Sequence, residues 1–120
     1  MSTQQEETLG DGSLDIRTEH EGSDCVISLR GEIDLANAQT FRSQLWQAMA
    51  DDGAGKIVVD MSELEFIDSS GIAVVVEALN AENGAERLRF RPSRFPAVPR
   101  VLELTGLTGR LPSPEGDTAG

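Results

Sequence analysis

The run Lys56-Ile57-Val58-Val59-Asp60 constrains the fold of this chain more than any other segment. It is short, apolar and rich in β-branched residues, which is typical of a central strand covered on both faces. Residues 70–81 then carry apolar side chains at helical spacing, and residues 86–91 alternate again in the manner of a strand. A strand, a helix and a second strand in that order predict a right-handed crossover within one sheet.

The segments on either side extend this pattern. Residues 14–18 and 25–34 alternate apolar and polar positions around a Gly22-Ser23-Asp24 turn, which predicts a β-hairpin. Helices are expected over residues 36–50 and 98–104, where apolar residues recur every three or four positions. The order of elements therefore predicts an α/β sandwich, with a mixed sheet of about four to five strands and helices packed mainly on one side.

Several details of these elements are also predicted. Asp34 or Asn37 is expected to cap the helix over residues 36–50, because a short side-chain oxygen accepts hydrogen bonds from free backbone N–H groups. The segment 61–67 is expected to be a connection with three buried anchors: Leu64, Phe66 and Ile67. The strand over residues 86–91 is expected to turn three arginines outward: Arg87, Arg89 and Arg91. Trp46 is expected to be partly buried.

The length of 120 residues fits one domain, because domains typically hold about 100–150 residues. Residues 1–13 and 112–120 carry too few apolar side chains to offset the entropy lost on ordering. We therefore expect a folded domain over residues 14–111 between two disordered tails. The polar, acidic start of the chain does not have the pattern of a secretory signal.

The composition is strongly acidic, with 10 Lys and Arg residues against 21 Asp and Glu residues and a net charge of −11. Because phosphate binding depends on Lys and Arg, this argues against a direct nucleic-acid binder. No apolar run approaches the roughly 20 residues of a membrane-spanning helix. The single cysteine, Cys25, excludes an internal disulfide, and the single histidine, His20, removes most metal-site patterns. We expect a cytoplasmic protein with neither metal nor cofactor, in which Cys25 is a small core side chain.

The segment Asp68-Ser69-Ser70-Gly71 carries the chemistry predicted for this chain. It places two hydroxyls at the start of the helix over residues 70–81, where free N–H groups and the helix dipole favour a phosphate. Gly71 has no Cβ, so a partner's backbone could approach it closely. The same residues also fit a simple helix cap, which on spacing alone is the more frequent explanation. Composition and spacing therefore do not separate a modification site from a cap.

Three stretches of the chain resemble the STAS-domain family, in particular its stand-alone anti-sigma factor antagonists. Residues 29–34 are similar to the family's G-E-[LI]-D strand and turn. Residues 57–62, followed by residues 66–72, resemble its D-S-S/T-G phosphorylation loop. Residues 98–107 are similar to its closing helix and [ST]-G-L end. The stretches follow one another in the family's order.

The resemblance implies a STAS-like sandwich that acts as a phosphorylation-controlled binding switch and not as an enzyme. Ser69 corresponds to the phosphoacceptor, and Asp34, Asp68, Ser70 and Gly71 correspond to the surrounding loop and partner-binding residues. The implied partners are an anti-sigma factor with serine kinase activity and a metal-dependent phosphatase. The unphosphorylated form would bind the anti-sigma factor and so release a sigma factor for transcription.

Other functions remain as alternatives. Within the same fold, the chain could be a STAS subunit of a lipid-transport or stress-signalling complex. A small serine hydrolase would pair Ser69 or Ser70 with His20, although His20 lies in a polar stretch and a G-x-S-x-G motif is absent. The basic residues between 84 and 110 either counterbalance the acidic half of the chain or form a second docking surface, for example for weak self-association.

Overall fold

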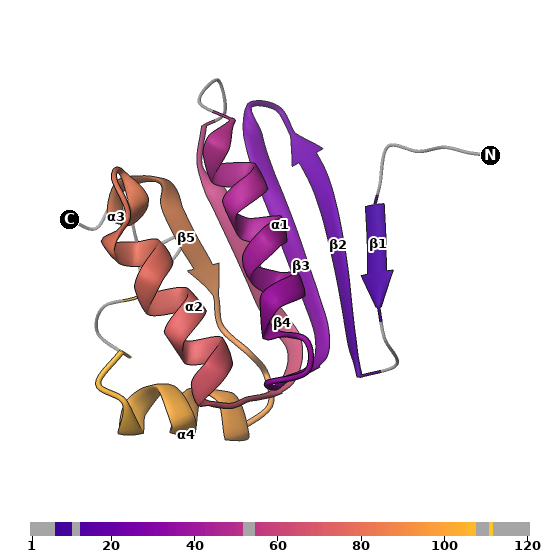
Figure 1. Ribbon diagram of the computed structural model, residues 1–120, viewed down its shortest axis with the longest axis vertical. Helices are drawn as coiled ribbons and strands as arrows, with labels where there is room; N and C mark the ends of the chain where they lie inside the picture. The colour runs from indigo at the N-terminus through magenta and orange to yellow at the C-terminus, as the bar shows by residue number, and fades with distance from the viewer. Residues whose placement is uncertain (1–6, 11–12, 52–54, 108–110, 112–120) are drawn as a thin grey trace.

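The computed structural model describes the backbone of residues 7–10 and all of residues 13–51, 55–107 and 111. Its elements in chain order are β1 (Glu7–Gly10), β2 (Leu14–Glu21), β3 (Asp24–Ile33), α1 (Ala38–Ala50), β4 (Ile57–Ile67), α2 (Ser69–Asn80), α3 (Gly84–Arg87), β5 (Leu88–Arg91) and α4 (Ala97–Leu104). The strands form one sheet in the order β1-β2-β3-β4-β5 (Figure 1). The pairs β1–β2 and β2–β3 are antiparallel, whereas β3–β4 and β4–β5 are parallel. This confirms the predicted α/β fold with a mixed sheet.

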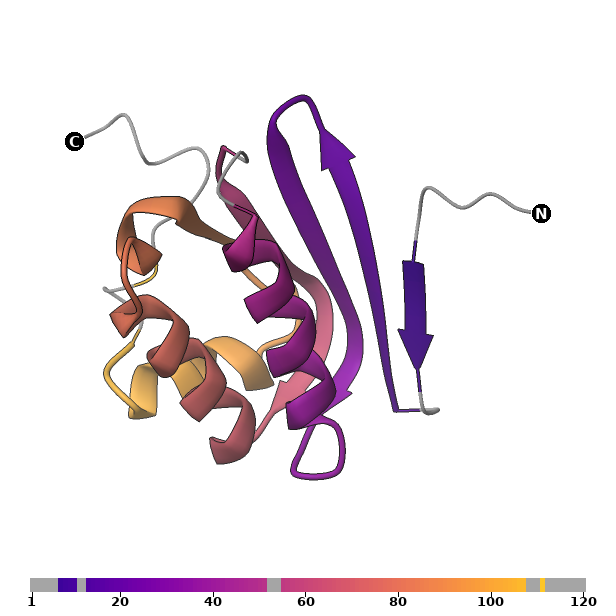
Figure 2. The same ribbon diagram turned by 45° about the horizontal axis from the view of Figure 1, so that its top comes forward.

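The helices pack on one face of this sheet, as predicted (Figure 1 and Figure 2). Helices α1 and α2 lie side by side on it, and α4 crosses the end of the sheet where α2 begins. The side chains between the sheet and the helices form one apolar cluster, to which each of these elements contributes: Ile27, Phe41, Val59, Val75 and Val98. The apolar periodicity of the sequence therefore identified the core face of each of these elements.

The other face of the sheet carries no helix among the described residues, which corrects the expectation that residues 56–60 are covered on both sides. Val58 lies on this open face and is nevertheless only 5% exposed. It stands in register between Val26 and Arg89, which are also buried. The second cover of this central strand is therefore a layer of neighbouring side chains.

Strand β1 lies where the sequence predicts a disordered tail. Residues 7–10 pair with β2 along their whole length. This pairing satisfies backbone groups at the free edge of β2, so it leaves little trace in the hydrophobic pattern. The remaining parts of the predicted tails, residues 1–6, 11–12 and 112–120, lie outside the described residues.

Strand β4 continues through residues 61–67, which the sequence analysis assigned to a connection. Leu64 and Ile67 are buried as predicted, but Phe66 is 39% exposed. Phe66 pairs with Glu32 of β3, whereas Leu64 pairs with Gly31, so β4 carries one extra residue at this point. This irregularity interrupts the strand's alternation, so that Leu64 and Ile67 both reach the core and Phe66 between them does not. The prediction of a buried Phe66 is therefore wrong.

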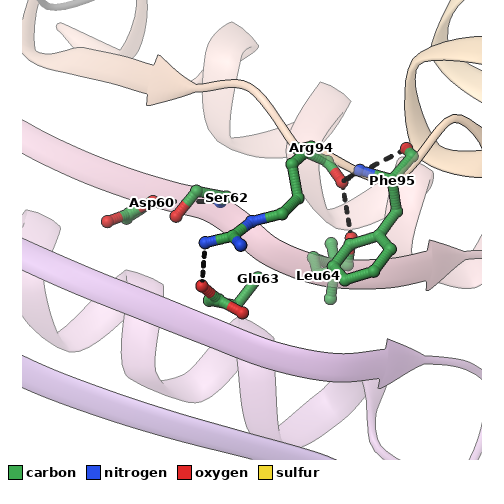
Figure 3. Close-up of polar contacts among 7 residues, drawn as sticks. Asp60, Ser62, Glu63, Leu64, Arg94 and Phe95 are labelled. Carbon is green, nitrogen blue, oxygen red and sulfur yellow. Dashed lines mark hydrogen bonds and ion pairs between the residues drawn. The ribbon is translucent and has the colours of Figure 1, made fainter.

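The loop after β5 is fastened to this second half of β4, as Figure 3 shows. The Ser93 hydroxyl donates to the Leu64 carbonyl oxygen at 2.6 Å, and the Arg94 backbone N–H donates to the Ser62 carbonyl oxygen at 3.3 Å. The Arg94 guanidinium also pairs with the Glu63 carboxylate. These contacts place α4 beside the end of β4.

The arginines of the basic segment are largely engaged within the fold. Arg87 belongs to the single turn α3, and its guanidinium donates to three backbone carbonyl oxygens around the end of α1: those of Met49 (3.0 Å), Asp51 (3.0 Å) and Gly55 (3.3 Å). Arg89 is only 9% exposed, whereas Arg91 and Arg94 pair with carboxylates of β4. The predicted strand position is therefore wrong for Arg87, which lies in α3, whereas Arg89 shares the outer face of the sheet with Val58 but is buried there. These contacts favour the counterbalancing role over a free docking surface.

Candidate functional site

The candidate site lies at the carboxyl ends of the parallel strands β3 and β4. Ile33 and Ile67 are register partners, and the Asp68 backbone N–H donates to the Ile33 carbonyl oxygen at 3.1 Å. Because the carboxyl ends of parallel strands meet at one edge of a sheet, the two loops that follow them are neighbours. The structure thus brings together Asp34 and Asp68, which are far apart in the sequence.

Asp68 is the N-terminal cap of α2. Its Oδ1 atom accepts hydrogen bonds from the Ser70 backbone N–H (2.9 Å), the Ser70 hydroxyl (2.5 Å) and the Gly71 backbone N–H (3.4 Å). The Ser70 hydroxyl is the largest cause that lowers the Asp68 pKa below its ordinary value, and the backbone N–H groups of Gly71, Ser70 and Leu35 lower the pKa further. The carboxylate therefore caps the start of α2, while the backbone N–H of the same residue bonds to the end of β3.

The two serine hydroxyls of the motif differ in their surroundings. Ser69 is exposed, and its hydroxyl makes no hydrogen bond among the residues that the structure describes. Ser70 is half-buried, and its hydroxyl is held by Asp68. Composition and spacing alone did not separate a modification site from a cap, whereas the family resemblance implied Ser69 as the phosphoacceptor. Ser69 is the one whose oxygen is accessible to a modifying enzyme.

The loop after β3 is held by Asn37. This residue is only 3% exposed. Its Oδ1 atom accepts from the Asp34 backbone N–H at 2.9 Å, and its Nδ2 atom donates to the Glu32 carbonyl oxygen at 3.1 Å and to the Ser13 hydroxyl at 3.0 Å. Asn37 stands at the expected cap position of α1, yet its side chain makes no hydrogen bond to the helix. It instead fixes the turn that carries Asp34 and Leu35.

Gly71 has a different role from the predicted one. It is buried, and a Cβ atom on it would lie 2.7 Å from Ile33 Cγ2 and 2.7 Å from Ile67 Cγ1. The missing Cβ therefore lets the start of α2 approach the ends of β3 and β4. The expectation that Gly71 admits a partner's backbone is wrong in this structure, because the protein's own isoleucines occupy that space.

The segments that carry the site's side chains, the end of β3 with its following loop and β4 with α2, are acidic. Residues 31–41 and 57–86 contain no Lys or Arg. Arg42 on α1 is engaged elsewhere, since its guanidinium pairs with Glu77 of α2 through two hydrogen bonds of 3.0 Å and stacks on Trp46 at 4.4 Å. Trp46 is half-buried, as predicted. A phosphate on Ser69 would thus enter a region of negative charge.

A serine hydrolase site is not formed by the described residues. His20 pairs with Cys25, which lies opposite Ile57 at the start of β4, whereas Ser69 follows the end of that strand. A strand of 11 residues at about 3.3 Å per residue separates the two ends by about 30 Å. His20 and Cys25 instead line a separate hollow of about 210 Å³ at the far end of the sheet.

Cys25 is a buried thiol. Burial is the largest cause that raises the Cys25 pKa, and the negative charge of Asp51 raises the pKa further.

Among the described residues, no group of three or more His, Cys, Asp or Glu side chains is arranged to hold a metal ion. None of the helices in the described ranges is both long and apolar enough to cross a membrane.

The fold and the site define a small α/β module whose exposed serine begins a helix at the carboxyl edge of the sheet. A family model described as "Mlab, STAS domain" matches residues 16–113, so the chain belongs to the STAS-domain family, as its motifs predicted. The anti-sigma F factor antagonist of Paenibacillus polymyxa is 28% identical over 103 residues, which cover 83% of this chain and 86% of the relative. The anti-sigma-F factor antagonist RsfA of Mycobacterium tuberculosis is 32% identical over 107 residues, with coverages of 83% and 79%. The crystal structure of an anti-sigma factor antagonist from Mycobacterium paratuberculosis matches with a TM-score of 0.76 and 27% identity over 92% of this chain and 95% of that chain.

Proposed function

We propose that this protein is an anti-sigma factor antagonist whose binding is switched by phosphorylation of Ser69. The observation that carries the proposal is the exposed Ser69 hydroxyl at the start of α2, in a chain whose named relatives are anti-sigma factor antagonists. Unphosphorylated, the protein binds an anti-sigma factor in the cytoplasm and so releases a sigma factor. Asp34, Asp68, Ser70 and Gly71 shape the loop around the switch.

The protein is the substrate of the modification. Transfer of a phosphoryl group requires a bound Mg-nucleotide and a group that accepts the serine proton. In this proposal the anti-sigma factor, acting as a serine kinase, supplies both of these. A metal-dependent phosphatase later restores the free hydroxyl, and the protein itself needs no cofactor.

The geometry of α2 explains why a phosphate would disturb binding. A phosphoserine adds a charge of about −1.5 to −2. A helix start usually welcomes this charge, but Asp68 already occupies the N–H groups of Ser70 and Gly71. The phosphate would therefore stand beside a carboxylate, and beside the nucleotide phosphates of a bound kinase. Desolvation of such an unpaired charge at an interface costs several kcal/mol, so the switch acts locally and without refolding.

The proposal is tested with a purified GHKL-type anti-sigma factor and Mg-ATP. Mass spectrometry should place the phosphate on Ser69, and Ser69→Ala should abolish it while leaving the complex intact. Ser69→Asp should bind at least tenfold more weakly. Ser70→Ala is the matched control and should still be phosphorylated at Ser69. Phosphate on Ser70, or a Ser69→Asp variant that binds as tightly as the unmodified protein, would refute the proposal.

A second measurement tests whether the switch is local. Backbone chemical shifts of the phosphorylated protein should change around the starts of α1 and α2 and stay constant at the far end of the sheet. Widespread changes would show refolding instead. The alternative of a lipid-transport subunit would gain support if the protein co-purified with membrane transporter subunits and received no phosphate.

A further inference from the structure

Leu35 is an apolar side chain that the fold leaves in solvent next to the switch. Among the described residues, three large apolar side chains are exposed: Leu35 (81%), Leu104 (80%) and Phe66 (39%). A single exposed leucine is ordinary on a protein surface. Leu35 differs because it lies on the loop directly after β3, and the last residue of β3, Ile33, accepts a hydrogen bond from Asp68, the cap that directly precedes Ser69.

The backbone of this loop is rigid. Leu35 lies two residues after Ile33, whose carbonyl oxygen accepts from the Asp68 backbone N–H at 3.1 Å. On either side of it, the Asp34 N–H donates to Asn37 Oδ1 at 2.9 Å and the Ala36 N–H donates to Asp34 Oδ1 at 3.0 Å. Because the loop is already ordered, a partner that covers Leu35 loses little affinity to further ordering. An exposed but preorganised apolar side chain has the properties of an interface anchor.

An enzyme that acts on Ser69 works beside the loop that carries Leu35. Asp68, which caps the helix that Ser69 begins, donates its backbone N–H to the Ile33 carbonyl oxygen at 3.1 Å, and Leu35 follows Ile33 by two residues. A kinase that encloses the Ser69 hydroxyl therefore approaches the exposed leucine as well. The surrounding strand ends present exposed carboxylates, Glu32 and Glu65, and no cation from residues 57–86.

We propose that Leu35 is the apolar anchor by which this protein binds its anti-sigma factor kinase, and that the kinase receives it in an apolar pocket with basic side chains facing Glu32 and Glu65. This inference rests on the proposed function and names the chemistry of the partner at that site. It also explains how the switch works, because a phosphate on Ser69 would place a hydrated charge against the wall of an apolar pocket.

The test compares Leu35→Ala with Leu104→Ala. Both leucines are about four-fifths exposed, so neither substitution should change the melting temperature, and the second controls for a general loss of apolar surface. We expect Leu35→Ala to weaken binding to the purified anti-sigma factor by about tenfold or more, which is the size expected for an interface hot spot. Leu104→Ala should stay within about twofold of the unmodified protein, which is the effect of a residue outside the hot spot.

Phosphorylation kinetics give a readout that a purely structural role would not move. Leu35→Ala should raise KM for phosphorylation of Ser69 and leave kcat unchanged, because Leu35 contributes to binding and is not part of the reacting group. Leu35→Met should restore most of the affinity. The inference is overturned if Leu35→Ala binds within about twofold of the unmodified protein while Ser69→Asp does not bind. If the unmodified protein itself neither binds nor is phosphorylated, the proposed function fails and this inference fails with it.

Discussion

Replacement of Gly71 by alanine tests the packing that positions the switch. The new Cβ would lie 2.7 Å from Ile33 Cγ2, 2.7 Å from Ile67 Cγ1 and 3.0 Å from Ile67 Cδ1. Carbon atoms prefer separations of about 3.5–4.0 Å, so the start of α2 must move outward by roughly 0.5–1 Å or the isoleucines must leave their rotamers. Overpacking of this kind costs about 1–3 kcal/mol, and the better helix propensity of alanine returns about 1 kcal/mol. We expect a net loss of about 1 kcal/mol, and at most about 2 kcal/mol.

Thermal and urea unfolding followed by circular dichroism measure this loss. For a folded unit of about 100 residues, 1 kcal/mol lowers Tm by roughly 4–8 °C. Ile67→Val removes the Cδ1 atom and with it one of the close contacts. The cost of Gly71→Ala should therefore be smaller in the Ile67→Val background, by about 0.5 kcal/mol or more. This coupling assigns the loss to crowding and not to a general effect on the helix.

The two explanations of Gly71 differ in outcome. If the glycine served mainly to admit a partner's backbone, Gly71→Ala would keep its stability and lose only binding. If it serves packing, stability falls first, and phosphorylation of Ser69 falls because the helix start moves relative to Asp68. A Gly71→Ala variant that is as stable as the unmodified protein would refute the packing argument.

Three other predictions follow from contacts elsewhere in the structure. Arg87→Lys keeps the charge but cannot reach three carbonyl oxygens at once, so the free energy of unfolding should fall by about 1–2 kcal/mol in urea titrations, and an unchanged midpoint would contradict this role. Asp68 has a lowered pKa in the folded state, so its stabilisation is present above its unfolded pKa of about 3.9 and is lost as pH falls through the folded value. Asp68→Asn should therefore reduce stability at pH 7 and flatten the acid side of the profile, whereas parallel profiles would disprove the assignment. Cys25, whose pKa is raised mainly by burial, should react with a thiol reagent at least about tenfold more slowly in the folded protein than in urea, and equal rates would contradict its burial.

Much of the fold could be predicted because hydrophobic periodicity reports which face of an element is buried. The helices over residues 38–50, 69–80 and 97–104 lie within two residues of their predicted bounds. Strand β1 was missed because it depends on backbone pairing with the edge of β2, and backbone groups are the same for every residue. Phe66 was misassigned because composition does not reveal that residues 61–67 remain a strand with two faces.

Arg87 shows a second limit of sequence reasoning. Its alternation with Leu88 suggests an outward position on a strand, but the chain makes one turn of helix before the strand starts. Its carbonyl partners lie 32 to 38 positions away in the chain. A charged side chain that caps a distant helix end therefore has no local signal, whereas the apolar face of a helix repeats every turn.

Some features of the candidate site can be predicted from the local sequence, and others depend on contacts between segments that are distant in the chain. An N-cap side chain accepts from the second and third residues of its helix, so a cap at Asp68 engages Ser70 and Gly71 and leaves the hydroxyl of the first helical residue, Ser69, unengaged. The capping rule thus accounts for the two N–H groups that Asp68 engages, whereas the exposure of Ser69 and the bond from the Ser70 hydroxyl to Asp68 are seen only in the structure. The hydrogen bond from the Asp68 N–H to the Ile33 carbonyl oxygen also has no local signal, because it depends on β3 and β4 being parallel and ending together. In the proposed switch, the motif therefore supplies the serine, and the parallel ends of β3 and β4 place the loop after β3 next to it.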